Sequence, residues 1–232
     1  MKEMKSIQVE KLLDLSKTIA FQLFSGHLFP WEVLPDINSY LMELGNNLDQ
    51  NQFDHPQENV WIAKSANVFS SAYITGPCII DEDAEIRHCA FIRGSVLIGK
   101  YAVVGNSTEI KNSILFDGVQ VPHYNYVGDS VLGFKSHMGA GAVTSNVKSD
   151  KSPVTIRFEG KTIETTLRKF GAILGDFAEI GCGTVLNPGS LVGRNTNIYP
   201  LSMVRGVVSE GSIYKNKNEI VDKSCVIQDL HS

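Results

Sequence analysis

An aliphatic side chain returns at every sixth residue through the middle of this chain of 232 residues, and this period constrains the fold more than any other feature. Ten consecutive positions follow the spacing, and nine of them hold Ile or Val: Ile62, Val68, Ile74, Ile80, Ile86, Ile92, Ile98, Val104, Ile110 and Phe116. Neither a helix of about 3.6 residues per turn nor an alternating strand produces a repeat of six. A β-solenoid does, because each hexad forms one flat side of a coil and its branched residue points inward.

The repeat is interrupted and then resumes at Leu174, Ile180, Leu186, Val192, Ile198 and Val204. Between the two series, Val127 and Leu132 are only five residues apart, and residues 144–168 match no hexad. Residues 154–164 alternate around Gly160, which predicts a hairpin that projects from the solenoid. Irregular loops on a rigid scaffold often carry sites, so a functional site is expected near these interruptions.

The first part of the chain has helical periodicity instead. One apolar face is predicted for a helix with Leu12, Leu15, Ile19 and Leu23, which Gly26 would end, and a second helix is expected to begin near Pro35. Residues 50–58 have the composition of a polar linker. The expected organisation is a helical segment at 1–58, a solenoid domain at 59–213 with the inserted loop 144–168, and a tail at 214–232.

Composition excludes several classes of protein. The formal charge of −4, with both signs mixed along the chain, argues against a nucleic-acid partner. The four cysteines, Cys78, Cys89, Cys182 and Cys225, lack the spacing of metal ligands or of a disulfide framework, so we expect reduced thiols and no metal. The N-terminus is charged and amphipathic, and no apolar run reaches membrane-spanning length, so we expect a soluble cytoplasmic protein without a membrane partner.

Residues 93–146 contain several functional residue types at fixed spacing. The segments are ArgGlySerValLeuIleGly from Arg93, GlyAsnSerThrGluIleLys ending at Lys111, HisTyrAsnTyrValGlyAspSer from His123 and GlyAlaGlyAlaValThrSerAsn ending at Asn146. They closely resemble the acetyltransferase domain of the bifunctional glucosamine-1-phosphate acetyltransferase/N-acetylglucosamine-1-phosphate uridyltransferase. The later ArgLysPheGlyAlaIleLeuGlyAsp from Arg168 resembles archaeal-type sugar-1-phosphate nucleotidyltransferases, and the resemblance spans roughly residues 30–208.

The resemblance implies an all-β fold, a left-handed parallel β-helix of hexapeptide repeats with a small N-terminal helical segment. Only the resemblance implies the hand, which is unusual beside the right-handed crossover rule. It further implies a homotrimer with active sites between subunits, and direct acyl transfer from acetyl-CoA or another acyl-CoA to an amino-sugar phosphate such as glucosamine 1-phosphate or an epimer. The family's nucleotide-binding half has no counterpart here, so we do not expect the chain to make a nucleotide sugar.

The same resemblance assigns roles to individual residues. His123 matches the general base, and imidazole with a pKa of about 6.5 suits the removal of a proton from the attacking amine. Arg93, Lys111 and Tyr126 match residues that hold the sugar phosphate, and a guanidinium with an ammonium suits a dianion.

Further positions match the acyl-CoA site of the family. Ala140 and Asn146 align directly, and a peptide N–H at Ala140 would support the oxyanion of the reaction. Cys182 and Pro200 fall on later cofactor positions by their place in the hexads. A covalent role for Cys182 is not expected, because the family transfers the acyl group directly.

Some basic residues have roles that the resemblance leaves open. Lys148 and Lys151 either lie in an exposed mobile loop or reach the substrate of a neighbouring subunit. The CoA phosphates are a candidate ligand for Arg205, Lys215 and Lys217.

Two departures from the family concern the acceptor sugar. His137 stands where the family has asparagine in the sugar pocket, and Val147 stands where it has tyrosine. A neutral imidazole donates and accepts on different ring atoms, unlike the amide group, so we expect the sugar specificity to be shifted away from glucosamine 1-phosphate.

Two other functions remain open at this point. A hexapeptide-fold carbonic anhydrase needs three metal-binding histidines with two of them closely spaced, whereas His88, His123 and His137 are the histidines of the solenoid and none forms an HxxxxH pair. A non-catalytic solenoid, binding a sugar nucleotide or serving assembly and related to UDP-N-acetylglucosamine pyrophosphorylase, is the other alternative. The joint presence of the matched site residues argues against it.

Overall fold

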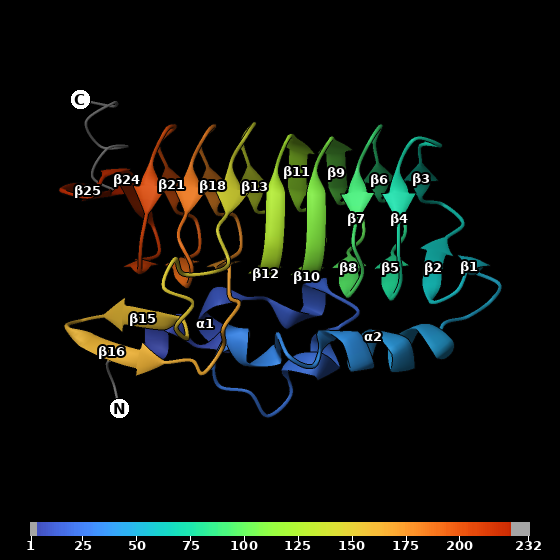
Figure 1. The fold of residues 1–232 in the computed structure, drawn as a ribbon, viewed down its shortest axis with the longest axis horizontal. Helices are drawn as coiled ribbons and strands as arrows, with labels where there is room; N and C mark the ends of the chain where they lie inside the picture. Colours follow the sequence, from blue (N-terminus) through green and yellow to red (C-terminus); the bar gives the residue numbers. More distant parts are fainter. Residues whose placement is uncertain (1–3, 224–232) are drawn as a thin grey trace.

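The computed structural model describes residues 4–223 and consists of a parallel β-solenoid with an N-terminal segment of short helices along one side (Figure 1). The N-terminal segment contains η1 (Lys5–Ile7), α1 (Val9–Leu12), η2 (Leu15–Lys17), η3 (Phe21–Phe24), η4 (Pro30–Val33) and α2 (Ile37–Asn46). None of the helices in this described part of the chain is both long and apolar enough to cross a membrane. Cys78 is buried, Cys89 and Cys182 are exposed free thiols, and Cys225 lies outside the described residues.

The N-terminal segment differs in two places from the sequence expectations. The continuous helix from Leu12 to Leu23 is wrong, because the chain is extended at Leu13 and Thr18. The carboxylate of Asp14 accepts a hydrogen bond from the Ser16 backbone N–H, and such local side-chain bonds compete with helical ones. The second helix is confirmed, since α2 begins at Ile37.

The expected polar linker at residues 50–58 instead contains the first strand. β1 (Phe53–Gln57) pairs antiparallel with β2 (Val60–Ala63), and the side chain of Phe53 is buried. The polar composition therefore belongs to the exposed residues of an edge strand.

The solenoid has three flat faces, each a stack of short parallel strands. Face one contains β2, β5 (Cys78–Ile80), β8 (Val96–Ile98), β17 (Ala172–Leu174), β20 (Ser190–Val192) and β23 (Val207–Val208). Face two contains β4 (Tyr73–Ile74), β7 (Phe91–Ile92), β14 (Val143–Thr144), β19 (Val185–Leu186) and β22 (Met203–Val204). Face three contains β3 (Asn67–Val68), β6 (Glu85–Ile86), β9 (Val103–Asn106), β11 (Gln120–His123), β13 (His137–Met138), β18 (Glu179–Ile180), β21 (Asn197–Ile198) and β24 (Ser212–Asn216).

Three further strands complete this arrangement. β10 (Glu109–Leu115) and β12 (Tyr126–Leu132) each run from face two into face one, and β25 (Glu219–Asp222) pairs antiparallel with β24 at the C-terminal end. The parallel β-helix that the hexapeptide period predicted is therefore confirmed.

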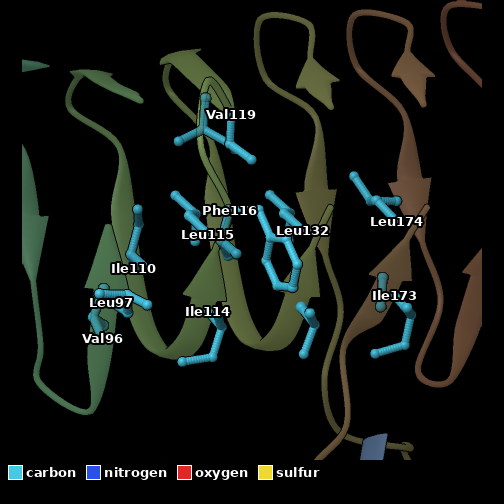
Figure 2. Close-up of a cluster of buried hydrophobic side chains, with 14 of the residues drawn as sticks. Val96, Leu97, Ile110, Ile114, Leu115, Phe116, Val119, Leu132, Ile173 and Leu174 are labelled. Atoms are coloured by element: carbon cyan, nitrogen blue, oxygen red, sulfur yellow. The ribbon is translucent and has the colours of Figure 1, made fainter. Parts of the chain in front are cut away.

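The pairing of the side chains that point into the solenoid differs from the predicted repeat at one position. Leu115, and not Phe116, pairs with Ile98 and continues to Leu132 and Leu174, as Figure 2 shows for the leucines. The step from Ile110 to Leu115 is thus five residues long, like the later step from Val127 to Leu132. Both short steps lie within the long strands β10 and β12, which continue from one face to the next.

The N-terminal segment covers face one. In each of its strands the middle side chain points away from the interior of the solenoid, because successive side chains of a strand point to opposite sides. Ile79, Leu97 and Ile114 occupy this position, yet they have no exposed surface. α2 contacts β5, β8 and β10, and the ring of Phe24 packs edge-on against Phe116 with the ring centroids 5.7 Å apart. The helices of residues 4–223 cover neither face two nor face three (Figure 1).

The predicted hairpin is confirmed within the insertion. β15 (Thr155–Phe158) and β16 (Lys161–Glu164) pair antiparallel, and Gly160 lies between them with a left-handed φ of 75°. The chain leaves the solenoid after β14 on face two and returns with β17 on face one. The insertion therefore leaves and re-enters at the edge between these faces.

Truncation of an inward leucine tests the corrected register. Leu115→Ala should lower the free energy of unfolding by about 2–5 kcal/mol, because it opens a cavity in the continuous column. Leu201→Ala is the matched control, since its side chain is 86% exposed and the change should cost less than about 0.5 kcal/mol. Chemical denaturation of both variants measures the difference, and equal losses would contradict the register.

Candidate functional site

Two cationic side chains from successive coils meet at the edge between faces two and one. Arg93 follows the inward Ile92, Lys111 follows the inward Ile110, and the pairing of these two isoleucines sets the cations side by side. Arg93 Nη1 lies 2.6 Å from Glu109 Oε1, and 45% of the arginine side chain is exposed. The register of the solenoid therefore places side by side the two residues for which the family resemblance implies binding of the sugar phosphate.

A buried carboxylate, Asp129, stands at the centre of this cluster. Its side chain is 5% exposed, and Lys111 Nζ lies 3.3 Å from its Oδ2 atom. Asn112 Nδ2 donates to Asp129 Oδ1 at 3.0 Å, and Asn146 Nδ2 donates to Asp129 Oδ2. Asp129 was missed at the sequence level.

A repeated spacing marks the position of Asp129. Asn112, Asp129 and Asn146 are each 17 residues apart and occupy the same corner of three successive coils. Backbone φ is left-handed at Asn112 and Asp129, a conformation that Asn and Asp tolerate better than most residues. The residue type at this corner thus follows from backbone geometry as well as from the polar contacts.

Tyr126 completes the cluster on face two, where it pairs with Glu109 on one side and Val143 on the other. Its hydroxyl accepts a hydrogen bond of 3.3 Å from Asn146 Nδ2. Burial raises the pKa of Tyr126, and the nearby charges of Asp129 and Glu109 raise it further. The phenol therefore stays protonated near neutral pH and can donate a hydrogen bond to an anion or a sugar oxygen.

The formal charges of the cluster cancel, because Arg93 is paired with Glu109 and Lys111 with Asp129. The two pairs differ in their surroundings. The Arg93 pair is exposed and exchanges readily with solvent, whereas the Lys111 pair is held by a buried carboxylate. An incoming phosphate would therefore take Arg93 from Glu109 more easily than it would take Lys111 from Asp129.

The other edge of face two carries His123, the last residue of β11. The carbonyl of His123 accepts from Gly141 N, the carbonyl of Ala140 from Gly183 N, and the carbonyl of Cys182 from Leu201 N, at 3.0, 2.8 and 2.8 Å. This ladder sets His123, Ala140, Cys182 and Pro200 at one repeat position on successive coils. We call these four residues the His123 column.

The imidazole of His123 is exposed. Its backbone N–H donates to Asn125 Oδ1 at 3.0 Å, while the ring forms no hydrogen bond with any residue from 4 to 223. The ring is therefore accessible to a ligand, and no carboxylate of the described chain orients it.

The turn residues beside the His123 column leave open space at one position. Tyr124, Gly141, Gly183 and Leu201 all have left-handed φ. A side chain on Gly141 would meet nothing within 4 Å, whereas Tyr124 and Leu201 are large and strongly exposed. Gly141 thus leaves open space beside Ala140, whereas a side chain on Gly183, beside Cys182, would come within 2.8 Å of Leu201 Cδ2.

The structure does not bring His137 into the cluster within one chain. His137 lies on β13 of face three, and its Nδ1 atom is 2.9 Å from Glu179 Oε2. Both residues line a cavity of ≈ 420 Å³ together with Gln120 and Lys135. No group of three or more His, Cys, Asp or Glu side chains that could hold a metal occurs among the described residues.

The remaining candidate lysines have local partners or are exposed. Lys148 Nζ donates to Ser152 Oγ at 2.6 Å and lies 3.6 Å from Asp150, and Lys151 is exposed. Lys215 is paired with Glu219 at 2.6 Å, and Lys217 is exposed.

Comparison with known proteins finds relatives across most of the chain. A family model described as the GMPPB C-terminal domain matches residues 74–187. The bifunctional protein GlmU of Methanococcus vannielii is 33% identical over 93% of this chain and 53% of its own length. The bifunctional sugar-1-phosphate nucleotidylyltransferase/acetyltransferase of Sulfurisphaera tokodaii is 31% identical over 80% of this chain and 47% of its own length.

In one shorter relative, the alignment covers the same share of its length as of this chain. YaiX of Escherichia coli, an uncharacterized acetyltransferase, is 28% identical over 75% of each chain. The chain spans about half the length of the GlmU proteins that it matches.

Removal of Lys111 tests the buried ion pair. Lys111→Ala should lower the free energy of unfolding by about 1–4 kcal/mol, because it leaves the Asp129 carboxylate buried with amide partners alone. Lys215→Ala removes an exposed pair and should cost less than about 1 kcal/mol. Urea unfolding of both variants measures this, and equal losses would mean that Asp129 is solvated.

Proposed function

The chain is a homologue of the GlmU-type bifunctional proteins, aligned with about half of their length, and from this premise we propose that it is an acyl-CoA-dependent sugar N-acyltransferase. Acetyl-CoA is the proposed acyl donor, and an amino-sugar phosphate such as glucosamine 1-phosphate or an epimer is the proposed acceptor. The observation that carries the proposal is that the Arg93–Lys111 cluster and the His123 column line opposite edges of one face.

In the proposed reaction, bound acyl-CoA supplies a thioester carbonyl to the acceptor amine. The amine nitrogen forms a bond to the carbonyl carbon as the carbon–sulfur bond breaks, and CoA leaves as the thiol. The imidazole of His123 takes the proton that the amine loses and returns it to the departing sulfur. Ala140 is an exposed residue, and its backbone N–H, which forms no hydrogen bond to another described residue, would stabilise the oxyanion.

The acceptor phosphate would bind at the other edge of face two. Arg93 offers a planar fork that matches phosphate oxygens, and Tyr126 offers a protonated hydroxyl between the two edges. The side-chain Nδ2 of Asn146 donates to Asp129 and Tyr126, so its side-chain oxygen, Oδ1, remains for a ligand. The open space at Gly141 suits the narrow pantetheine arm of CoA.

We further propose a homotrimer in which face two of one protomer meets face three of the next. The N-terminal segment covers face one, so within the described part of the chain faces two and three are the flat surfaces that remain for packing. Face two carries exposed apolar side chains at Tyr73, Val185 and Met203, which favour contact with another surface. His137 would then approach the acceptor from the neighbouring protomer.

The direct experiment is a screen of acceptors with acetyl-CoA, following the release of free CoA. Amino-sugar 1-phosphates and nucleotide-linked amino sugars form the panel. Acceptor-dependent release of CoA supports the proposal. Binding of a sugar nucleotide without any release would instead favour a non-catalytic solenoid.

Substitution of His123 tests the general base. His123→Ala should lower kcat by about two to four orders of magnitude without loss of fold. His88→Ala is the matched control, because its carbonyl belongs to the same backbone ladder and its ring packs on Phe69. The control should keep the wild-type rate, and an unchanged rate in His123→Ala would remove His123 from the mechanism.

Substitution of Arg93 tests the phosphate site. Arg93→Ala should raise the KM of the acceptor about 10- to 100-fold and leave the KM of acetyl-CoA almost unchanged, because the proposed ligand of this charge is the acceptor phosphate and not CoA. Lys111→Ala should act in the same direction. Arg87→Ala, which removes a half-buried pair with Glu85 away from the cluster, is the control, and equal changes in both KM values would contradict the assignment.

Substitution of His137 tests its role in sugar specificity. His137→Asn should partly restore the use of glucosamine 1-phosphate, because an amide donates and accepts at one end of the side chain. The measurement is kcat/KM for a panel of epimeric amino-sugar phosphates in both forms. If the wild type already prefers glucosamine 1-phosphate and no ratio changes, His137 has no part in specificity.

A further inference from the structure

A cavity of ≈ 570 Å³ lies between the insertion and the later coils, and no residue of the Arg93–Lys111 cluster or of the His123 column lines it. One wall is the solenoid edge with Ser145, Asn187 and Arg205, and the other is the insertion with Lys148 and Arg157. The volume is in the range of small-molecule sites in proteins, about 300–1,000 Å³. The cavity therefore has both the size and the polar lining of a binding site.

The charge of the cavity is uncompensated. Asp150 lies in the lining, but it accepts hydrogen bonds from Ser152 N and Oγ and faces Lys148 at 3.6 Å. Neither Arg157 nor Arg205 forms an ion pair with any residue in the described part of the chain. By contrast, Arg87, Arg93 and Arg194 each have a carboxylate partner. Two guanidinium groups thus line one cavity, and neither is paired with a carboxylate of the described residues.

The hairpin wall is packed firmly against the solenoid. Val154 and Ile156 are completely buried, and a side chain on Gly189 would come within 2.7 Å of Val154 Cγ1. A side chain on Gly206 would come within 3.1 Å of the Arg157 carbonyl oxygen. The two glycines therefore allow β15 to lie close to the coils, and this contact holds Arg157 opposite Arg205.

The cavity is a separate anion position from the Arg93–Lys111 cluster. Ser145, Asn187 and Arg205 occupy the repeat position of Lys111 on later coils, through the pairing of Thr144, Leu186 and Val204. Four coil spacings of about 4.8 Å separate Lys111 from Arg205, or about 19 Å, so one phosphate group does not reach both.

We propose that this cavity binds the diphosphate of a nucleoside 5′-diphosphate group, with Arg157 and Arg205 each holding phosphate oxygens and Lys148 at the rim. Two planar guanidinium forks match two phosphates, and the volume leaves space for part of the nucleoside. The group has two possible sources if the proposed function holds: the ADP part of CoA, or a nucleotide carried by the acceptor sugar. Both present the same diphosphate to the two arginines.

Calorimetric titration of the whole protein with UDP, ADP, CoA and inorganic phosphate tests the site. At least one nucleotide should bind more than about 10-fold more tightly than phosphate, and Arg157→Ala and Arg205→Ala should each weaken it by about 10- to 100-fold. Arg87→Ala should leave the affinity unchanged. Where alanine lowers the unfolding temperature, Arg157→Gln and Arg205→Gln keep the length of the side chain and serve instead.

The pattern of affinities identifies the source of the ligand. If the arginine variants lose affinity only for ADP and CoA, the cavity belongs to the acyl donor. If they lose affinity only for UDP, it belongs to a nucleotide-linked acceptor. The proposal is overturned if the wild type binds no nucleotide, or if both arginine variants bind as Arg87→Ala does. Arginine-dependent nucleotide binding without acyl transfer would uphold this site and refute the proposed reaction.

Discussion

The backbone hydrogen-bond ladder between coils is the interaction on which the rest of this structure depends. Parallel pairing sets residues 17 or 18 positions apart directly beside each other, as for Ile80 with Ile98 and Ile98 with Leu115. Residues at one repeat position therefore form a column along the solenoid, with about 4.8 Å between successive coils. Each column has its own environment. The inward columns supply the buried aliphatic core, so the coils cannot slip by one residue without exposing it.

The same ladder turns corner positions into functional surfaces. A rigid corner repeats the same backbone direction on every coil, so side chains from distant parts of the sequence point along one edge. The His123 column and the Asn112, Asp129 and Asn146 series arise in this way. The insertion then adds a second wall at the edge where the repeat is broken, and this makes the cavity around Arg157 and Arg205.

The period of six was sufficient to predict the solenoid and most of its inward positions, and the alternation of residues 154–164 predicted the hairpin around Gly160. It did not predict that Leu115 replaces Phe116 in the ladder, because both residues are apolar and buried, and the choice depends on how β10 turns the corner. The helix expected from Leu12 to Leu23 failed because polar residues at Asp14 and Thr18 bond to the local backbone. Asp129 was missed since its role depends on neighbours in adjacent coils, and the position of His137 on another face follows only from the three-dimensional register.

The central claim is that His123 and His137 act in one site formed by face two of one protomer and face three of the next. The most direct measurement mixes two variants, His123→Ala and His137→Arg, by unfolding and refolding them together, and follows CoA release. A shared site predicts that the mixture recovers activity well above the sum of the separate variants, because some interfaces combine an intact His123 with an intact His137. Mass spectrometry verifies that mixed assemblies have formed. If their activity equals the sum of the activities of the separate variants, the shared site is contradicted.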